Sequence, residues 1–450
     1  MKWFSKLWQI LRQDKLLQRV IRNSSYLLSS NGVAIVLGMV QSILAARLLG
    51  VFSLGILGIV AEFSSNINRL LSSRMSEMVV KYLGDYLPQE KKQEAAAIVK
   101  AAAIIEAISS ILAFIILMAL APLAARYLVK DPQTAPFFWF FGVSILGNLV
   151  AETSNGVLQA TDRFSKQATI NLMQSMITAA IITAAFLFNG SFLMVLTGYM
   201  VGKLILGIGP TVLAWRGLRE TLGERWWQAS LSVLPPWREL LRFIASTNLT
   251  TTVNLVCRDS EQLWIAYFLT PQFVGYYKIA LAITRWLPIP VTPFISTTYP
   301  EIARIVAGRD WKKVRTLLRR VTFMSAVYTA LAAIGMVLFG KWILQLYGSE
   351  FLPAYPALLI LLLGYGLSNI MFWNRPLLLS FNLPAYPFFA TLATGTLKVL
   401  LAFLVVPTFG FVGAAALLSG YFIISGGLMV ARGFKELARS ELAYPEGEAA

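Results

Sequence analysis

Residues 97–121 decide the fold class, and they read AIVKAAAIIEAISSILAFIILMALA, with Lys100 and Glu106 as the only charged side chains. At 1.5 Å per residue, a helix of these 25 residues would be about 38 Å long, more than the roughly 30 Å hydrocarbon core of a bilayer. A long apolar stretch with so few charges is typical of a transmembrane helix. The stretch therefore predicts a membrane span.

The composition of the whole chain agrees with this interpretation. Of its 450 residues, 57% are apolar and only 14% are charged, whereas a soluble domain carries about 25% charged residues. The mean hydropathy is +0.66. Most of the surface must then face something other than water, so the composition indicates an integral membrane protein.

The rarest residues exclude several function classes. The chain has no histidine, which removes the commonest metal ligand and the commonest general base. Its single cysteine, Cys257, can form neither an intramolecular disulfide nor a cysteine-rich metal site. We therefore predict that the protein is not an enzyme and has no catalytic residues, no metal site and no cofactor.

The apolar segments recur through the whole chain, and each is close to the roughly 20 residues that cross a bilayer as a helix. The twelve segments are 24–46, 52–73, 97–121, 136–158, 168–189, 191–214, 241–268, 274–297, 318–340, 353–374, 385–406 and 410–432. The predicted fold class is all-α, a polytopic membrane protein with about twelve transmembrane helices in two six-helix bundles related by a pseudo-two-fold axis.

The basic residues alternate between the loops and thereby predict the orientation. The net charge of +17 would suggest nucleic acid in a soluble protein, but here most Lys and Arg residues lie in short loops, so we exclude a nucleic-acid partner. With the amino terminus inside, 29 basic residues fall on the inner side, 4 on the outer side and 6 within spans. The positive-inside rule therefore predicts a multi-pass protein of the cell (inner) membrane with both termini cytoplasmic.

An internal repeat supports the division into two halves. Residues 48–57 resemble residues 268–277 at an offset of 220, and Glu77 corresponds to Glu301 at an offset of 224. Because each half has an even number of spans, both halves enter the membrane from the same side, and the repeat is parallel. The predicted domains are an interfacial helix 1–22, an N-terminal bundle 23–214, a cytoplasmic linker 215–240, a C-terminal bundle 241–432 and a cytoplasmic tail 433–450.

The first 22 residues place Trp3, Phe4, Leu7, Trp8 and Leu11 on one helical face with Lys and Arg around it. This pattern predicts an amphipathic helix on the inner leaflet. The alternative is a basic topology signal without a fixed structure.

Ionisable residues within the spans are costly, at about 2.5–3.5 kcal/mol for each central charge, and they mark a protein interior or a wet cavity. The eleven residues are Glu62, Arg69, Glu106, Glu152, Lys203, Arg258, Asp259, Glu261, Lys278, Arg285 and Lys398. Helical spacing puts Arg258 and Glu261 on one face and Asp259 about 100° away. Such pairs could line a cargo cavity, or they could be ion pairs that only fix helix packing.

Four stretches together resemble the oligosaccharide-flippase branch of the multidrug/oligosaccharidyl-lipid/polysaccharide exporter superfamily. They are residues 46–50 (ARLLG), 158–164 (LQATDRF), 273–280 (FVGYYKIA) and 299–304 (YPEIAR). The resemblance implies a V-shaped pair of bundles that works by alternating access. It also implies a cargo, an oligosaccharide on a polyprenyl diphosphate that moves from the inner to the outer leaflet for cell-surface polysaccharide synthesis.

The resemblance also implies a basic cavity formed by spans one, two, seven and eight, and it assigns phosphate contacts by span position. Arg69, Arg258, Lys278 and Arg285 are the candidate phosphate-binding residues. For the sugar, Asn248, Thr251 and Asn254 supply amides and a hydroxyl. The candidate sites for a coupling ion, H⁺ or Na⁺, are Glu62, Asp259 and Glu261, although trapping by a polysaccharide polymerase outside would need no ion.

Three alternatives remain open at this stage. A multidrug cation antiporter with the same fold would need mainly acidic residues in its cavity, because Asp or Glu would exchange protons for a cationic drug. A flippase for the peptidoglycan precursor lipid would have fourteen spans rather than twelve. A membrane glycosyltransferase or polymerase would carry a large outer loop. The predicted partners are the lipid-linked oligosaccharide and the membrane lipids, and an H⁺ or Na⁺ ion and a polysaccharide polymerase are possible further ones.

Overall fold

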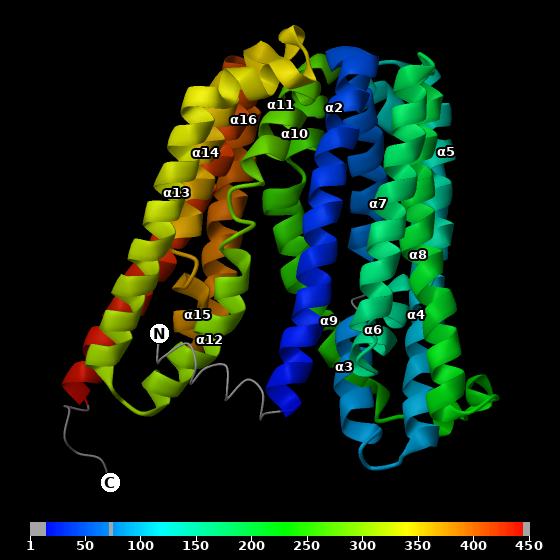
Figure 1. Cartoon of the computed structure of the whole chain (residues 1–450), viewed down its shortest axis with the longest axis vertical. Helices are drawn as coiled ribbons and strands as arrows, with labels where there is room; N and C mark the ends of the chain where they lie inside the picture. The colour runs from blue at the N-terminus through cyan, green and yellow to red at the C-terminus, as the bar shows by residue number, and fades with distance from the viewer. Residues whose placement is uncertain (1–14, 72–74, 444–450) are drawn as a thin grey trace. The chain divides into compact units, whose positions relative to one another are not determined.

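The computed structural model describes residues 15–71 and 75–443, and within these ranges every regular element is a helix (Figure 1). Within the described residues, eight helices are long and apolar enough to cross a membrane. Ten of the twelve apolar segments lie in these eight helices, because the first and the last of them hold two segments each. The predicted all-α membrane fold is confirmed. The predicted interfacial helix lies mostly in residues 1–14, outside the described residues.

Two glycines turn the chain back within the two longest helical elements. The first element, α2 (Lys15–Leu71), is non-helical at Gly50, where φ is 70°, and the last, α16 (Ala385–Ala443), is non-helical at Gly410, where φ is 63°. Figure 1 shows the chain reversing its direction within α2. Glycine adopts a positive φ without strain, and this conformation interrupts the helix. Gly50 and Gly410 therefore end one span and begin the next.

The N-terminal unit comprises Met1–Leu48, Phe63–Ala125 and Pro132–Leu249. Its helices after α2 are α3 (Met75–Tyr86), α4 (Lys92–Ala124), η2 (Pro132–Thr134), α5 (Ala135–Gly147), α6 (Ala151–Ala160), α7 (Phe164–Leu187), α8 (Phe192–Leu222), η3 (Trp226–Gln228), η4 (Leu231–Val233) and most of α9 (Trp237–Asn254). The two 3₁₀ turns η3 and η4 fall in the segment 215–240, which we predicted as a linker.

The C-terminal unit comprises Leu49–Glu62, Arg126–Asp131 and Thr250–Ala450. Its helices are most of the π-turn η1 (Ala125–Val129), η5 (Leu255–Asp259), α10 (Glu261–Phe268), α11 (Pro271–Thr284), α12 (Thr292–Ala307), α13 (Trp311–Tyr347), η6 (Ser349–Ala354), α14 (Tyr355–Ile370), α15 (Asn374–Ser380) and α16. The segments 241–268 and 274–297 are the two that form no continuous long helix, because α9 to α12 are interrupted.

The same local packing occurs in both units. In the N-terminal unit, the short amphipathic helix α3 packs against α6 and α4, and in the C-terminal unit α12 packs against α15 and α13. Glu77 lies on α3 and Glu301 on α12, so the sequence offset of 224 joins structurally equivalent helices. Apolar side chains bury one face of each helix: Met78 and Val79 on α3, and Ile302 on α12.

The segments 51–55 and 271–275, which the offset of 220 aligns, are in direct contact within the C-terminal unit. A Cβ atom added to Gly55 would lie 1.8 Å from the carbonyl oxygen of Pro271, and one added to Gly275 would lie 2.2 Å from that of Val51. The contacts are reciprocal, since 51 and 55 correspond to 271 and 275. These two helical segments are therefore related by a local two-fold, and glycine at both positions lets their backbones touch.

Alanine at position 55 is expected to lower the melting temperature of the purified protein. The new methyl group would push the two backbones apart, and overpacking of this kind costs about 1–3 kcal/mol. Thermal unfolding in detergent measures the change. The matched control is Gly38→Ala on the other arm of α2, where a Cβ has no neighbour within 4 Å and alanine has the better helix propensity. Equal melting temperatures for both variants would contradict the close crossing.

Candidate functional site

An irregular turn between α9 and α10 builds the site. Residues 255–259 form the π-turn η5, and Ser260 follows with φ −95° and ψ 17°. The Ser260 hydroxyl donates a hydrogen bond of 2.7 Å to the carbonyl oxygen of Leu255. π-Turns add a residue to a helix and change which side chains share a face, and they are frequent at functional sites.

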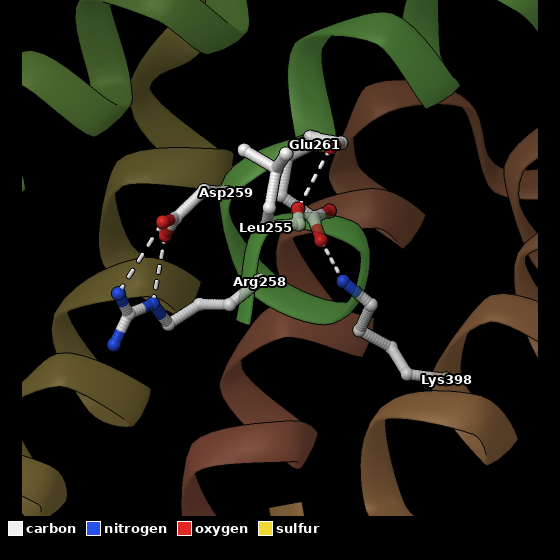
Figure 2. Close-up of polar contacts among 6 residues, drawn as sticks. Leu255, Arg258, Asp259, Glu261 and Lys398 are labelled. Atoms are coloured by element: carbon white, nitrogen blue, oxygen red, sulfur yellow. Dashed lines mark hydrogen bonds and ion pairs between the residues drawn. The ribbon is translucent and has the colours of Figure 1, made fainter. Parts of the chain in front are cut away.

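The turn separates Arg258 from Glu261. Arg258 pairs with Asp259, with 2.8 Å from Nε to Oδ1 and 3.4 Å from the second nitrogen to Oδ2. Glu261 instead forms an ion pair with Lys398 of α16, and Figure 2 shows the two pairs lying on different sides of the turn. The expectation that Arg258 and Glu261 share a face, with Asp259 elsewhere, is wrong, because it assumed an unbroken α-helix.

The Glu261–Lys398 ion pair is almost completely buried. The side chains are only 6% and 4% exposed, respectively, and they come from positions 137 residues apart in the sequence. A paired charge in an apolar interior is tolerated, whereas a single one is costly. This pair therefore fixes α10 on the first arm of α16.

Arg258 opens onto a cavity of about 210 Å³ within the C-terminal unit, which we call the Arg258 cavity. Residues from α9, η5, α14, α15 and both arms of α16 contribute to its wall. They are Asn254, Arg258, Ser368, Asn374, Arg375, Pro384, Pro387, Phe388, Thr391, Tyr421, Phe422, Ser425, Gly426 and Met429.

The chemistry of this wall suits an anion that also carries hydroxyl groups. Arg258 and Arg375 provide two guanidinium groups, which bind phosphate oxygens in a forked geometry. The amides of Asn254 and Asn374 add donors and acceptors. Sequence analysis missed Arg375 because it counted as one of the inner-loop cations. The signal that could have found it is its place as a lone cation between two apolar segments.

A second group of predicted residues meets at a crossing of α2, α10 and α11. The Gln262 side-chain amide donates a long hydrogen bond of 3.5 Å to Glu62. Gln262 and Lys278 both flank Gly58, since a Cβ there would lie 2.9 Å from the Gln262 oxygen and 3.6 Å from the Lys278 amine. Lys278 therefore lies at the same crossing as Gln262, the hydrogen-bond partner of Glu62, and does not line the Arg258 cavity.

The remaining predicted residues are spread over both units. Arg285 is exposed at the end of α11, and of the three predicted sugar contacts only Asn254 lines the Arg258 cavity. Asn248 belongs to the N-terminal unit and Thr251 to the C-terminal one. Arg69 lines a different cavity, of about 330 Å³, inside the N-terminal unit.

This N-terminal cavity is lined by α2, α5, α6, α7 and α8. Its residues are Ser64, Ser65, Asn68, Arg69, Phe141, Ser144, Ile145, Asn148, Ala151, Glu152, Asn155, Gln167, Ile170, Asn171, Lys203, Leu206 and Pro210. It contains two cations, one carboxylate and five side-chain amides. Three of the eleven ionisable residues that we predicted within spans therefore line this cavity: Arg69, Glu152 and Lys203.

Comparison with known proteins identifies relatives over most of the chain. Residues 43–356, which are 314 of the 450, match a family described as "Polysaccharide biosynthesis protein". The curated protein "Inner membrane protein YghQ" of Escherichia coli (strain K12) is 24% identical over 351 residues, which cover 76% of this chain and 96% of that protein. This relative and the apolar helices support a multi-pass protein of the inner membrane.

Solved structures show the same fold. An inward-facing multidrug resistance transporter of the MATE family, in the MOP superfamily, matches with a TM-score of 0.76 and 11% identity, over 92% of this chain and 96% of that one. The lipid II flippase MurJ in an inward closed conformation matches with a TM-score of 0.70 and 14% identity, over 92% and 90%. The family resemblance inferred from short sequence stretches is confirmed by the family match, and these structures show that the chain has the fold of transporters of this exporter superfamily.

Proposed function

Because the chain belongs to the polysaccharide biosynthesis protein family, we propose that it moves a polyprenyl-diphosphate-linked oligosaccharide from the inner to the outer leaflet by alternating access. One observation carries this proposal: two arginines, Arg258 and Arg375, line the same cavity of the C-terminal unit. A doubly charged diphosphate cannot cross hydrocarbon unaided, and two guanidinium groups match its two phosphates.

The local geometry suggests how the cavity exchanges its cargo. Asp259 holds the Arg258 guanidinium, whose side chain is 42% exposed. A cargo phosphate would replace Asp259 as the partner of Arg258, so the arginine keeps a negative partner in both states. Arg258 is therefore paired in both states, and the transport cycle avoids the free-energy cost of an unpaired cation within the membrane.

Hydroxyl and aromatic groups on the same wall fit the first sugars of the cargo. Thr391 and Ser425 offer hydroxyls, and Phe388 and Tyr421 offer rings on which a sugar can pack. MurJ, with the same fold, is a lipid II flippase, which is consistent with a lipid-linked cargo here.

For the coupling ion, H⁺ or Na⁺, the proposal keeps the three predicted carboxylates, Glu62, Asp259 and Glu261. Glu261 pairs with Lys398, Asp259 pairs with Arg258, and Glu62 accepts a hydrogen bond of 3.5 Å from Gln262. Binding of H⁺ or Na⁺ at one of these carboxylates would reduce its negative charge. We further propose that both termini lie in the cytoplasm. A polysaccharide polymerase outside would take up the released cargo.

Native mass spectrometry of the full chain in nanodiscs tests the proposed cargo. We expect a polyprenyl-diphosphate glycan to co-purify with the wild-type protein and to be lost in Arg258→Ala. The control is Arg304→Ala, which removes an exposed arginine outside the cavity that pairs with Glu301, and which should keep the lipid. Co-purification of cationic amphiphiles in place of the glycan lipid would overturn the proposal in favour of a multidrug antiporter.

A further inference from the structure

The N-terminal cavity has a composition that differs from the Arg258 cavity and that the proposed phosphate contacts do not explain. Its volume of about 330 Å³ lies at the lower end of the roughly 300–1,000 Å³ that is usual for small-ligand sites. All its lining residues belong to one unit, so the cavity is a property of that bundle alone.

Side-chain amides dominate the polar part of the wall. Asn68, Asn148, Asn155, Gln167 and Asn171 each carry an acceptor oxygen and a donor NH₂ group. Gln167 donates one hydrogen bond of 3.0 Å to Asn155, and Asn148 donates one of 2.8 Å to the carbonyl oxygen of Ser144, which leaves both donors and acceptors on the wall. A phosphate would need donors only, and a metal cation would need acceptors only. A wall that offers both matches a ligand with many hydroxyl groups, since each hydroxyl donates and accepts.

The charges on the wall add a second requirement. Arg69 and Lys203 are cationic and Glu152 is anionic, so the lining carries a formal net charge of +1. The N-terminus of α6, which also reaches this cavity, is already occupied: the buried carboxylate of Glu106 accepts hydrogen bonds of 2.8 Å from the backbone N–H groups of Glu152 and Thr153. An anionic ligand would therefore be held by Arg69 and Lys203.

Two residues of the same wall have polar atoms that lack hydrogen bonds. The hydroxyl of Ser64 and the side-chain oxygen of Asn68 are buried and have no partner within the described part of the chain. Buried polar groups are nearly always paired in native proteins. The helix that brings Arg69 to the cavity thus also brings two groups that a polar ligand or ordered water would satisfy.

From these features we infer that the N-terminal cavity binds an acidic sugar, a hexose that carries one carboxylate. The amides hold its hydroxyls, and Arg69 and Lys203 hold the carboxylate. This inference rests on the proposed function, since it makes the glycan of the cargo an acidic one, but it concerns a separate site in the other unit.

Binding of D-glucuronate and D-glucose to the purified full chain, followed by saturation-transfer difference NMR, tests this inference. The probes differ only in the carboxylate, and a charge-assisted hydrogen bond favours its ligand by about 10–150-fold. We expect glucuronate to bind at least about tenfold more tightly than glucose. Lys203→Gln should remove that preference and Lys203→Arg should keep it.

Three outcomes would overturn the inference: equal binding of both sugars, no saturable binding of glucuronate, or an unchanged preference in Lys203→Gln and in Arg69→Gln. Displacement of glucuronate by inorganic phosphate at equal concentration would also overturn it, because the site would then recognise charge alone. Arg258→Ala separates the two proposals, since it should abolish binding of the diphosphate lipid and leave glucuronate binding intact. If the wild-type protein bound no diphosphate lipid, or if Arg258→Ala still bound it, while glucuronate binding stayed intact, only the proposed function would be contradicted.

Discussion

Replacing Lys398 by alanine is expected to destabilise the protein by about 3–5 kcal/mol, because the change leaves Glu261 charged and buried without its partner. Both side chains are at most 6% exposed, so water cannot take over the role of the lysine. The free energy of unfolding in mixed micelles of dodecyl maltoside and SDS measures the loss. Glu261→Ala should give a loss of similar size.

Two further variants separate pairing from packing. In Glu261→Gln with Lys398→Met, both charges are removed while the side-chain volumes are nearly kept, and replacing a whole buried pair is often neutral or stabilising. The matched control is Arg315→Ala, which breaks the Arg315–Glu441 pair, whose side chains are 49% and 31% exposed. An exposed pair contributes about 0–1 kcal/mol. A loss for Lys398→Ala no larger than that of this control would contradict the buried ion pair.

The double variant Arg258→Ala with Arg375→Ala is expected to lower the affinity for geranylgeranyl diphosphate by about 10²–10⁴-fold. Each arginine of the Arg258 cavity would contribute a charge-assisted hydrogen bond of about 1.5–3 kcal/mol, and 1.4 kcal/mol is a factor of ten. Equilibrium binding of this probe to the protein in nanodiscs measures the effect. Each single variant should lose about 10–100-fold.

Removal of positive charge alone would weaken binding of any anion, so the control must remove an arginine elsewhere. Arg304→Ala changes the net charge by the same amount as each single variant, but at an exposed position, and it should bind the probe like the wild type. If the double variant bound as tightly as Arg304→Ala, the Arg258 cavity would not be the phosphate site.

Sequence alone predicted the fold because membrane spans are recognised by length and polarity. The apolar stretch 97–121 falls within α4, and the segments on either side of Gly50 form the two arms of α2. Each of these inferences depends on residues that are neighbours in the chain. The repeat offset of 220 was also visible, and the reciprocal contact of Gly55 and Gly275 is its physical counterpart.

The partners of the intramembrane charges could not be predicted in the same way. The spacing of Arg258 and Glu261 assumed 3.6 residues per turn, and the π-turn at Leu255–Asp259 changes that spacing without a distinctive sequence. Glu261 meets Lys398 across 137 residues, a pairing that no local pattern contains. Of the predicted phosphate and sugar residues, the Arg258 cavity brings together Arg258 and Asn254.

The sequence by itself thus determined that the chain crosses a membrane many times, which residues are charged within it, and to which superfamily it is similar. Tertiary structure alone decided that Arg375 joins Arg258, and that Arg69 and Lys203 meet in a separate amide-rich cavity. The physical reason is that a membrane span is recognised from consecutive apolar residues, whereas a site forms from side chains that lie far apart in the sequence. Which charges meet therefore depends on how the helices pack.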